Sequence, residues 1–132
     1  MDLSDAYTEI AERSMKASEA ALSEGLQESS GFLIYHAFES IGGALCCAKS
    51  RSYPRPHEKK LNVFTATAKR LAFGFPVAKL AVELVSLRNQ FLYPEEGPNR
   101  TIRQPKDIMT FVEVGLLKKP VGGIIHIVRR KI

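Results

Sequence analysis

An arginine and an asparagine stand side by side in the stretch SLRNQFLYPEEGPNR, residues 86–100. Arg88 follows Leu84 by four residues and Ala81 by seven, so helical spacing places it on an apolar stripe or at its edge. Burying an unpaired guanidinium costs much free energy. We therefore expect Arg88 to meet a carboxylate, a helix C-terminus, a partner chain or a ligand phosphate.

Asn89 and Tyr93 add an amide and a phenol to the same helix end. They lie four residues apart and so share a face, and Pro94 disfavours helical geometry at Tyr93. Two interpretations stay open. Either Arg88, Asn89 and Tyr93 form a binding or catalytic site, or Arg88 covers apolar surface and caps the last carbonyl groups of a helix.

Other site chemistries have weaker support in the sequence. Helical bundles can hold two metal ions between Glu-x-x-His motifs, but this chain has three histidines and only a reversed pair, His36 and Glu39. We expect His36 to form a hydrogen bond, with Glu39 as its candidate partner, rather than to bind metal. The chain also lacks a phosphate-binding glycine loop and a recognisable Ser-His-Asp arrangement. No metal or cofactor is expected.

Four long amphipathic segments must position these residues. They run from an Asp2 or Ser4 cap to about Gly25, from Gly31 to Ser50, from Pro56 or His57 to about Phe73, and from the breakers Gly74 and Pro76 to Tyr93. Gly42 and Gly43 interrupt the second segment. Since a glycine inside a helix costs about 1 kcal/mol relative to alanine, the pair indicates close approach of a neighbouring helix.

The C-terminal part, residues 105–132, divides into two predicted segments. Residues 105–119 predict a fifth helix with Ile108, Phe111, Val112 and Leu116 inward. Residues 120–132 fit a helix or a strand, and helix is favoured by the spacing of Val121, Ile124, Ile125 and Val128. Short connections favour antiparallel neighbours. The prediction is a single all-α domain, residues 1–132: an up-and-down four-helix bundle with an additional C-terminal helix or short extension.

Composition and charge narrow the class of protein. A chain of 132 residues can bury a hydrophobic core without a metal ion or a disulfide to stabilise it. No run of about 18–20 apolar residues predicts a membrane span. Cys46 and Cys47 are neighbours that would point about 100° apart on a helix, so they are expected to be reduced in a cytoplasmic protein. Residues 51–132 hold 16 basic and 6 acidic side chains, which suits a phosphate-rich partner or a solvated surface.

Three stretches resemble a HEPN domain, the nucleotide-binding and ribonuclease domain of defence systems. YHAFESIGGALCCAKS resembles the second helix of that family, PHEKKLNVF the start of its third and LRNQFLYPE the end of its fourth. The family signature is an arginine, usually followed directly by Asn, Asp or His, and a histidine after a gap of four to six residues. Arg88 and Asn89 match its opening, and Tyr93 stands where the histidine belongs. The resemblance covers roughly residues 3–119.

This resemblance implies a homodimer through the second and fourth helices, with two copies of Arg88 and Tyr93 in a shared cleft. In active members the arginine stabilises phosphate charge and the histidine moves protons during attack of the RNA 2′-hydroxyl, without metal. A phenol of pKa about 10 is a poorer base than an imidazole of about 6.5. The expected function is therefore binding of RNA, a nucleotide or a partner protein, in a toxin-antitoxin or defence context, without efficient catalysis.

The alternative is a metal-independent endoribonuclease that uses Arg88, Asn89 and Tyr93 across the dimer cleft. In that case we expect the RNA strand to be guided by four basic residues, Arg51, Arg55, Lys59 and Lys60. His36 and Glu39 would then position the site residues without contacting the RNA. A partner nucleotidyltransferase that modifies a tyrosine near the signature is a further expectation of the resemblance.

Overall fold

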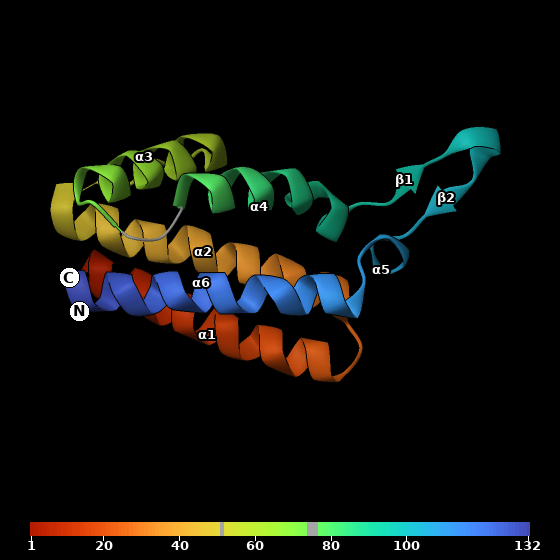
Figure 1. Cartoon of the computed structure of the whole chain (residues 1–132), viewed down its shortest axis with the longest axis horizontal. Helices are drawn as coiled ribbons and strands as arrows, with labels where there is room; N and C mark the ends of the chain where they lie inside the picture. Colours follow the sequence, from red (N-terminus) through yellow and green to blue (C-terminus); the bar gives the residue numbers. More distant parts are fainter. Residues whose placement is uncertain (51, 74–76) are drawn as a thin grey trace.

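The computed structural model describes residues 1–50, 52–73 and 77–132 and confirms an all-α bundle (Figure 1). Its elements are α1 (Leu3–Ser23), α2 (Gln27–Ser50), α3 (His57–Arg70), α4 (Val77–Leu92), β1 (Glu95–Glu96), η1 (Pro98–Arg100), β2 (Ile102–Arg103), α5 (Pro105–Ile108) and α6 (Phe111–Lys131). The predicted boundary at Gly74 and Pro76 lies outside the described residues. The other long segments begin and end within a few residues of their predicted limits.

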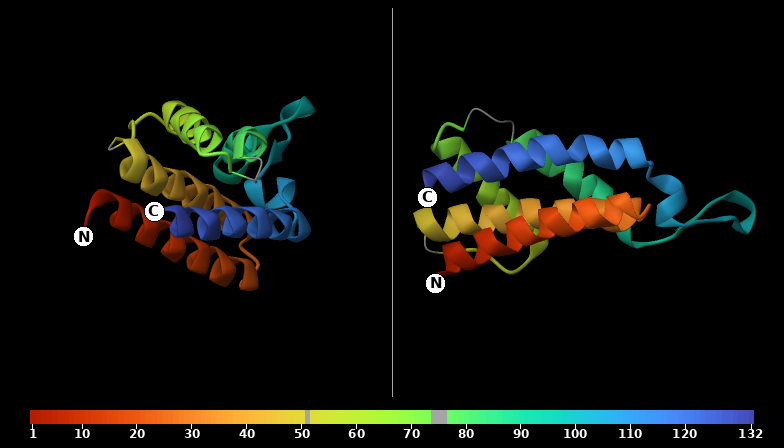
Figure 2. Two further views of the ribbon diagram at one scale, coloured as in Figure 1. Left: turned by 60° about the vertical axis from the view of Figure 1, so that its left-hand side comes forward. Right: turned by 90° about the horizontal axis from the view of Figure 1, so that it is seen from below.

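Helix α2 lies at the centre of the bundle. It runs beside α1 and α6 and packs on its other side against α3 and α4 (Figures 1 and 2). Its length and composition would allow it to cross a membrane, but 72% of that apolar window is buried inside the fold, as in the core helix of a globular protein. Because its own chain covers most of α2, this helix offers little surface to a second molecule.

The pairing of α1 with α2 depends on small side chains. Ser4, Ala11, Ser14 and Ser18 are buried on α1, which lets the two helices approach closely. The Ser4 hydroxyl donates to the Ala44 carbonyl at 2.8 Å across this contact. Leu3, at the start of α1, is 65% exposed.

The glycines of α2 lie under aromatic rings. A Cβ atom at Gly42 would stand 2.5 Å from the Phe64 ring of α3, and a Cβ atom at Gly31 would stand 2.5 Å from the Phe91 ring of α4. The close approach expected from the glycine pair is therefore confirmed at Gly42. Its neighbour Gly43 faces the rings of Tyr7 and Tyr53.

The C-terminal prediction was partly wrong. Residues 105–119 do not form one helix: α5 ends at Ile108, and α6 continues through Pro120 to Lys131. Phe111, Val112 and Leu116, expected inward, are 57%, 68% and 70% exposed.

The physical reason lies in the packing of α6. Its inward face is formed by Val114, Leu117, Val121, Ile124, Ile125 and Val128, all buried. Burial of this continuous stripe outweighs the cost of a proline inside the helix. The inward positions predicted for Val121, Ile124, Ile125 and Val128 are confirmed.

Residues 93–104 form a hairpin that we call the arm. Glu95 lies opposite Arg103 and Glu96 opposite Ile102 in an antiparallel pair. The arm leads away from the helices (Figure 1). Asn99 and Arg100 at its tip have φ angles of 59° and 58°.

Candidate functional site

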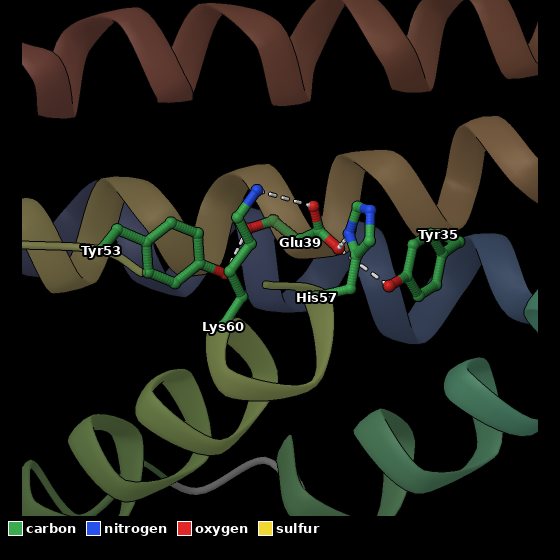
Figure 3. Close-up of polar contacts among 5 residues, drawn as sticks. All are labelled: Tyr35, Glu39, Tyr53, His57 and Lys60. Atoms are coloured by element: carbon green, nitrogen blue, oxygen red, sulfur yellow. Dashed lines mark hydrogen bonds and ion pairs between the residues drawn. The ribbon is translucent and has the colours of Figure 1, made fainter. Parts of the chain in front are cut away.

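The buried carboxylate of Glu39 contacts three polar side chains, those of Tyr35, His57 and Lys60. Glu39 is only 3% exposed on α2. The Tyr35 hydroxyl donates to Oε2 at 2.8 Å, His57 Nδ1 lies 2.8 Å from the same oxygen, and Lys60 Nζ donates to Oε1 at 3.2 Å (Figure 3). The Tyr53 hydroxyl donates to the main-chain carbonyl of Glu39 at 2.8 Å. We call these five residues the Glu39 cluster.

Two helices and one linker bring the cluster together. Tyr35 and Glu39 lie four residues apart on α2, and His57 and Lys60 lie three apart in the first turn of α3, so each pair shares a helix face. Tyr53 comes from the linker between those helices, where its ring packs edge-on against Tyr7 at 5.6 Å. The cluster therefore fixes the start of α3 against α2.

The hydrogen bonds keep Glu39 ionised. Burial alone would raise the pKa of the Glu39 carboxyl, but the hydrogen bonds from His57 and Tyr35 and the positive charge of Lys60 outweigh burial, and the pKa is lowered from its ordinary 4.5. Burial, the hydrogen bond to Glu39 and its charge raise the pKa of Tyr35, although the Arg88 charge opposes them. Burial also raises the pKa of Tyr53. Both phenols therefore act as hydrogen-bond donors rather than as bases.

His57 is the accessible member of the cluster, since its side chain is 53% exposed. A carboxylate only accepts hydrogen bonds, so in a neutral imidazole the contact with Glu39 assigns the proton to Nδ1. Nε2 is then left with its lone pair. A carboxylate-oriented histidine of this kind can accept a proton from a bound ligand.

Arg88 of α4 adjoins the cluster through Tyr35. Its guanidinium carbon lies 5.7 Å from the centroid of the Tyr35 ring, a cation–π distance. Its Nε is buried without a hydrogen-bond partner, and Arg88 forms no ion pair within the described part of the chain. The carboxylate that the sequence offered as one possible partner of Arg88 is therefore absent from the described part of the chain.

The other residues of the expected signature lie outside this contact. Asn89 is exposed, and Tyr93 is 56% exposed just beyond the end of α4. The Tyr93 amide donates to the Asn89 carbonyl at 3.0 Å and closes the last helical turn. The structure thus brings Arg88 to the Glu39 cluster and leaves Asn89 and Tyr93 on the surface.

Of the basic residues expected to guide RNA, some lie on the surface and one belongs to the Glu39 cluster. Arg55 and Lys59 are exposed, but the Lys60 side chain is only 17% exposed because it binds Glu39. Arg51 lies outside the described residues. Lys60 is therefore part of the cluster rather than of a surface for a nucleic acid strand.

The expected pairing of His36 with Glu39 is wrong. The His36 ring stacks on Phe32, with centroids 6.3 Å apart, while the Glu39 carboxylate binds Tyr35, His57 and Lys60. Residues three apart on a helix can share a face without touching. The sequence signals that were missed are the Tyr35-x-x-x-Glu39 and His57-x-x-Lys60 spacings.

No group of three or more metal-ligating side chains occurs among residues 1–50, 52–73 and 77–132. Cys46 and Cys47 both carry free thiols. Burial raises the pKa of the Cys46 thiol to about 11, so this thiol is protonated and unreactive at neutral pH. The groups available for chemistry in the described residues are therefore the hydrogen-bonded Glu39 carboxylate and the two basic side chains beside it, Lys60 and Arg88.

Comparison with known proteins found no relative of this chain. No family model matches the chain, and searches of curated proteins and of solved structures also gave no match. Function is therefore inferred from the residues around Glu39 and Arg88.

Proposed function

We propose that this chain is a HEPN-like, dimeric, cytoplasmic protein that binds the phosphate of RNA or of a nucleotide at Arg88, without efficient catalysis, in a toxin-antitoxin or defence context. The observation that carries the proposal is the state of the Arg88 guanidinium. It is half-buried against the Tyr35 ring, and its Nε has no partner among the described residues. A buried donor without an acceptor is costly, and a phosphate oxygen supplies that acceptor.

The surrounding charges favour an anion. Arg88 adjoins the cluster and Lys60 belongs to it, so two basic side chains lie here, and the contacts that lower the pKa of Glu39 already use its carboxylate oxygens. The exposed Arg55 lies in the linker before α3 and the exposed Lys59 in its first turn, both in the basic part of the chain. These residues can attract a polyanion over a longer range.

The proposed homodimer would use α4 rather than the covered surface of α2. Val82 and Val85 are 74% and 47% exposed on α4. They border an apolar groove of about 630 Å³ between α3 and α4, which Leu61, Ala66 and Ala81 help to line. An exposed valine ridge beside an apolar groove suits a twofold contact between two copies.

RNA titration of two α4 variants tests the binding proposal. Arg88→Ala is expected to weaken binding of a fluorescently labelled RNA by about tenfold or more, the usual scale for a lost charged hydrogen bond. Lys79→Ala removes the same charge from an exposed position of α4 and is expected to change affinity by less than about threefold. The measurement is fluorescence anisotropy at low and at raised salt. Equal weakening by both variants would show that only the overall charge matters.

His57 supports a second candidate, the metal-independent endoribonuclease. Its Nε2 can accept the proton of the RNA 2′-hydroxyl, after which the 2′-oxygen bonds to phosphorus, the bond to the 5′-oxygen breaks, and that oxygen takes a proton from water. In this alternative, binding of the scissile phosphate and further proton transfer are assigned to Arg88, Asn89 and Tyr93. The observation that favours it is the carboxylate-held imidazole, which shares Glu39 with Tyr35, the residue whose ring lies near the Arg88 guanidinium.

Cleavage of mixed single-stranded and structured RNA in EDTA separates the two candidates. If the chain is an enzyme, His57→Ala and Arg88→Ala are each expected to slow cleavage by about 100-fold or more. His126→Ala, at an exposed position of α6, is the matched control and keeps full activity. Intact RNA at high concentrations of wild-type protein would remove the ribonuclease and leave the binding protein.

A further inference from the structure

The arm is too small to be stable by itself. Its strands β1 and β2 contain two residues each, and an isolated two-stranded hairpin is marginally stable in water. Ile102 is 67% exposed and Tyr93 56% exposed, so the arm also presents apolar surface to solvent. A hairpin that leads away from its own bundle (Figure 1) and exposes Ile102 and Tyr93 among polar residues is typical of an element that docks on another molecule.

A second apolar surface lies between α4 and α6. We call it the α4–α6 groove; it encloses about 370 Å³ and is lined by Leu80, Leu87, Met109, Leu116, Leu117 and Pro120. Leu116 and the neighbouring Val112 are 70% and 68% exposed. These are the residues of α6 that the sequence pattern had placed in the core. Their exposure leaves an apolar face that the described part of the chain does not cover.

The arm contains two glutamates, Glu95 and Glu96, and two arginines, Arg100 and Arg103, and only its tip carries a net charge opposite to that of the groove. Glu83 of α4 and Glu113 of α6 line the groove. Arg100 stands at the tip of the arm and Arg103 on β2, beside the exposed Ile102. In this structure the arm leads away from the bundle (Figure 1). No residue of the arm lines the groove of its own chain.

We propose that the arm of one copy occupies the α4–α6 groove of a second copy of this chain. Ile102 then enters the apolar part of the groove, and Arg100 approaches Glu83 or Glu113. A twofold axis makes the contact reciprocal, so each copy gives one arm and receives one. The proposal rests on the α4-centred dimer of the proposed function, because α4 carries both the exposed valines and one wall of the groove.

Disulfide trapping between two different chains tests the contact. One chain carries Ile102→Cys and the other, with a tag that changes its length, carries Leu116→Cys, both in a Cys47→Ser background. Mild oxidation of the mixed chains is expected to give at least about tenfold more mixed covalent dimer than a control mixture of Ile102→Cys with Leu3→Cys. Leu3 is 65% exposed on α1, away from the groove. Equal trapping of both mixtures would overturn the proposal.

Sedimentation of two charge-introducing variants separates this inference from the dimer itself. Ile102→Asp is expected to weaken the wild-type dimer by about tenfold or more, because it places a carboxylate in an apolar groove beside glutamates. A dimer that resists Ile102→Asp but dissociates with Val82→Asp would overturn the arm contact and keep the α4 dimer. A wild-type chain that stays monomeric at high concentration would overturn both.

Discussion

Replacing Glu39 by alanine is expected to lower the free energy of unfolding by about 3–5 kcal/mol, the range for removing one partner of a buried ion pair. The Glu39 side chain is 5% exposed, and its removal leaves the Lys60 ammonium, His57 Nδ1 and the Tyr35 hydroxyl without their acceptor. The start of α3 would then lose its principal polar contact with α2. Urea unfolding followed by circular dichroism measures the change.

Glu58→Ala is the control, since Glu58 is an exposed carboxylate in the same turn of α3. It is expected to change stability by less than about 0.5 kcal/mol. A loss below about 1 kcal/mol for Glu39→Ala would contradict the central structural role of this carboxylate.

The same carboxylate predicts how stability depends on pH. The pKa of Glu39 is lowered in the folded protein from its ordinary 4.5. Its stabilising contribution is therefore present in full above that ordinary value and is lost as the pH falls through the lower folded-state pKa. Glu39→Gln should remove this part of the acid dependence. An acid unfolding curve that is the same in both proteins would argue against it.

Phe64→Ala is expected to destabilise the protein by about 3–5 kcal/mol, the usual cost of truncating a fully buried phenylalanine. The ring is 0% exposed, packs 5.1 Å from the Phe38 ring, and covers Gly42. Its loss leaves a cavity between α2 and α3, the two helices that carry the Glu39 cluster. Thermal and urea unfolding both report this change.

Gly42→Ala completes a double-mutant cycle at this contact. Alone it is expected to cost about 1–3 kcal/mol, because the new methyl group would stand 2.5 Å from the Phe64 ring. In the Phe64→Ala background the methyl group enters the vacated space, so the combined loss should be smaller than the sum by at least about 1 kcal/mol. Strictly additive losses would show that the ring does not restrict Gly42.

The periodicity of apolar residues was sufficient to predict the long helices. Val121, Ile124, Ile125 and Val128 fit a helical stripe, and all four are buried. The same reasoning failed at Pro120, because the predicted fifth helix ended at residue 119 whereas α6 continues through the proline. Burial on both sides of the proline keeps α6 continuous. The arm was missed because two-residue strands carry too little pattern to be recognised.

Spacing along a helix was also a good guide to where Arg88 lies, but not to what it contacts. Its half-buried position follows from Leu84 four residues earlier, whereas its neighbour Tyr35 comes from another helix. The partner of Glu39 was misassigned for the same reason: His57 is 18 residues away in sequence, and His36 is three. Periodicity identifies the face of a helix, and only tertiary packing selects the partner on that face.

The NMR spectrum of the arginine Nε–H groups tests most directly whether Arg88 receives a phosphate. The Arg88 signal is assigned as the one that disappears in Arg88→Lys, and labelled protein is titrated with a short single-stranded RNA. The proposed function predicts that this signal shifts saturably, as its buried Nε–H gains an acceptor, while the signals of exposed arginines such as Arg13 and Arg130 move less. An Arg88 signal that stays in place while the RNA binds and shifts other arginines would contradict the claim.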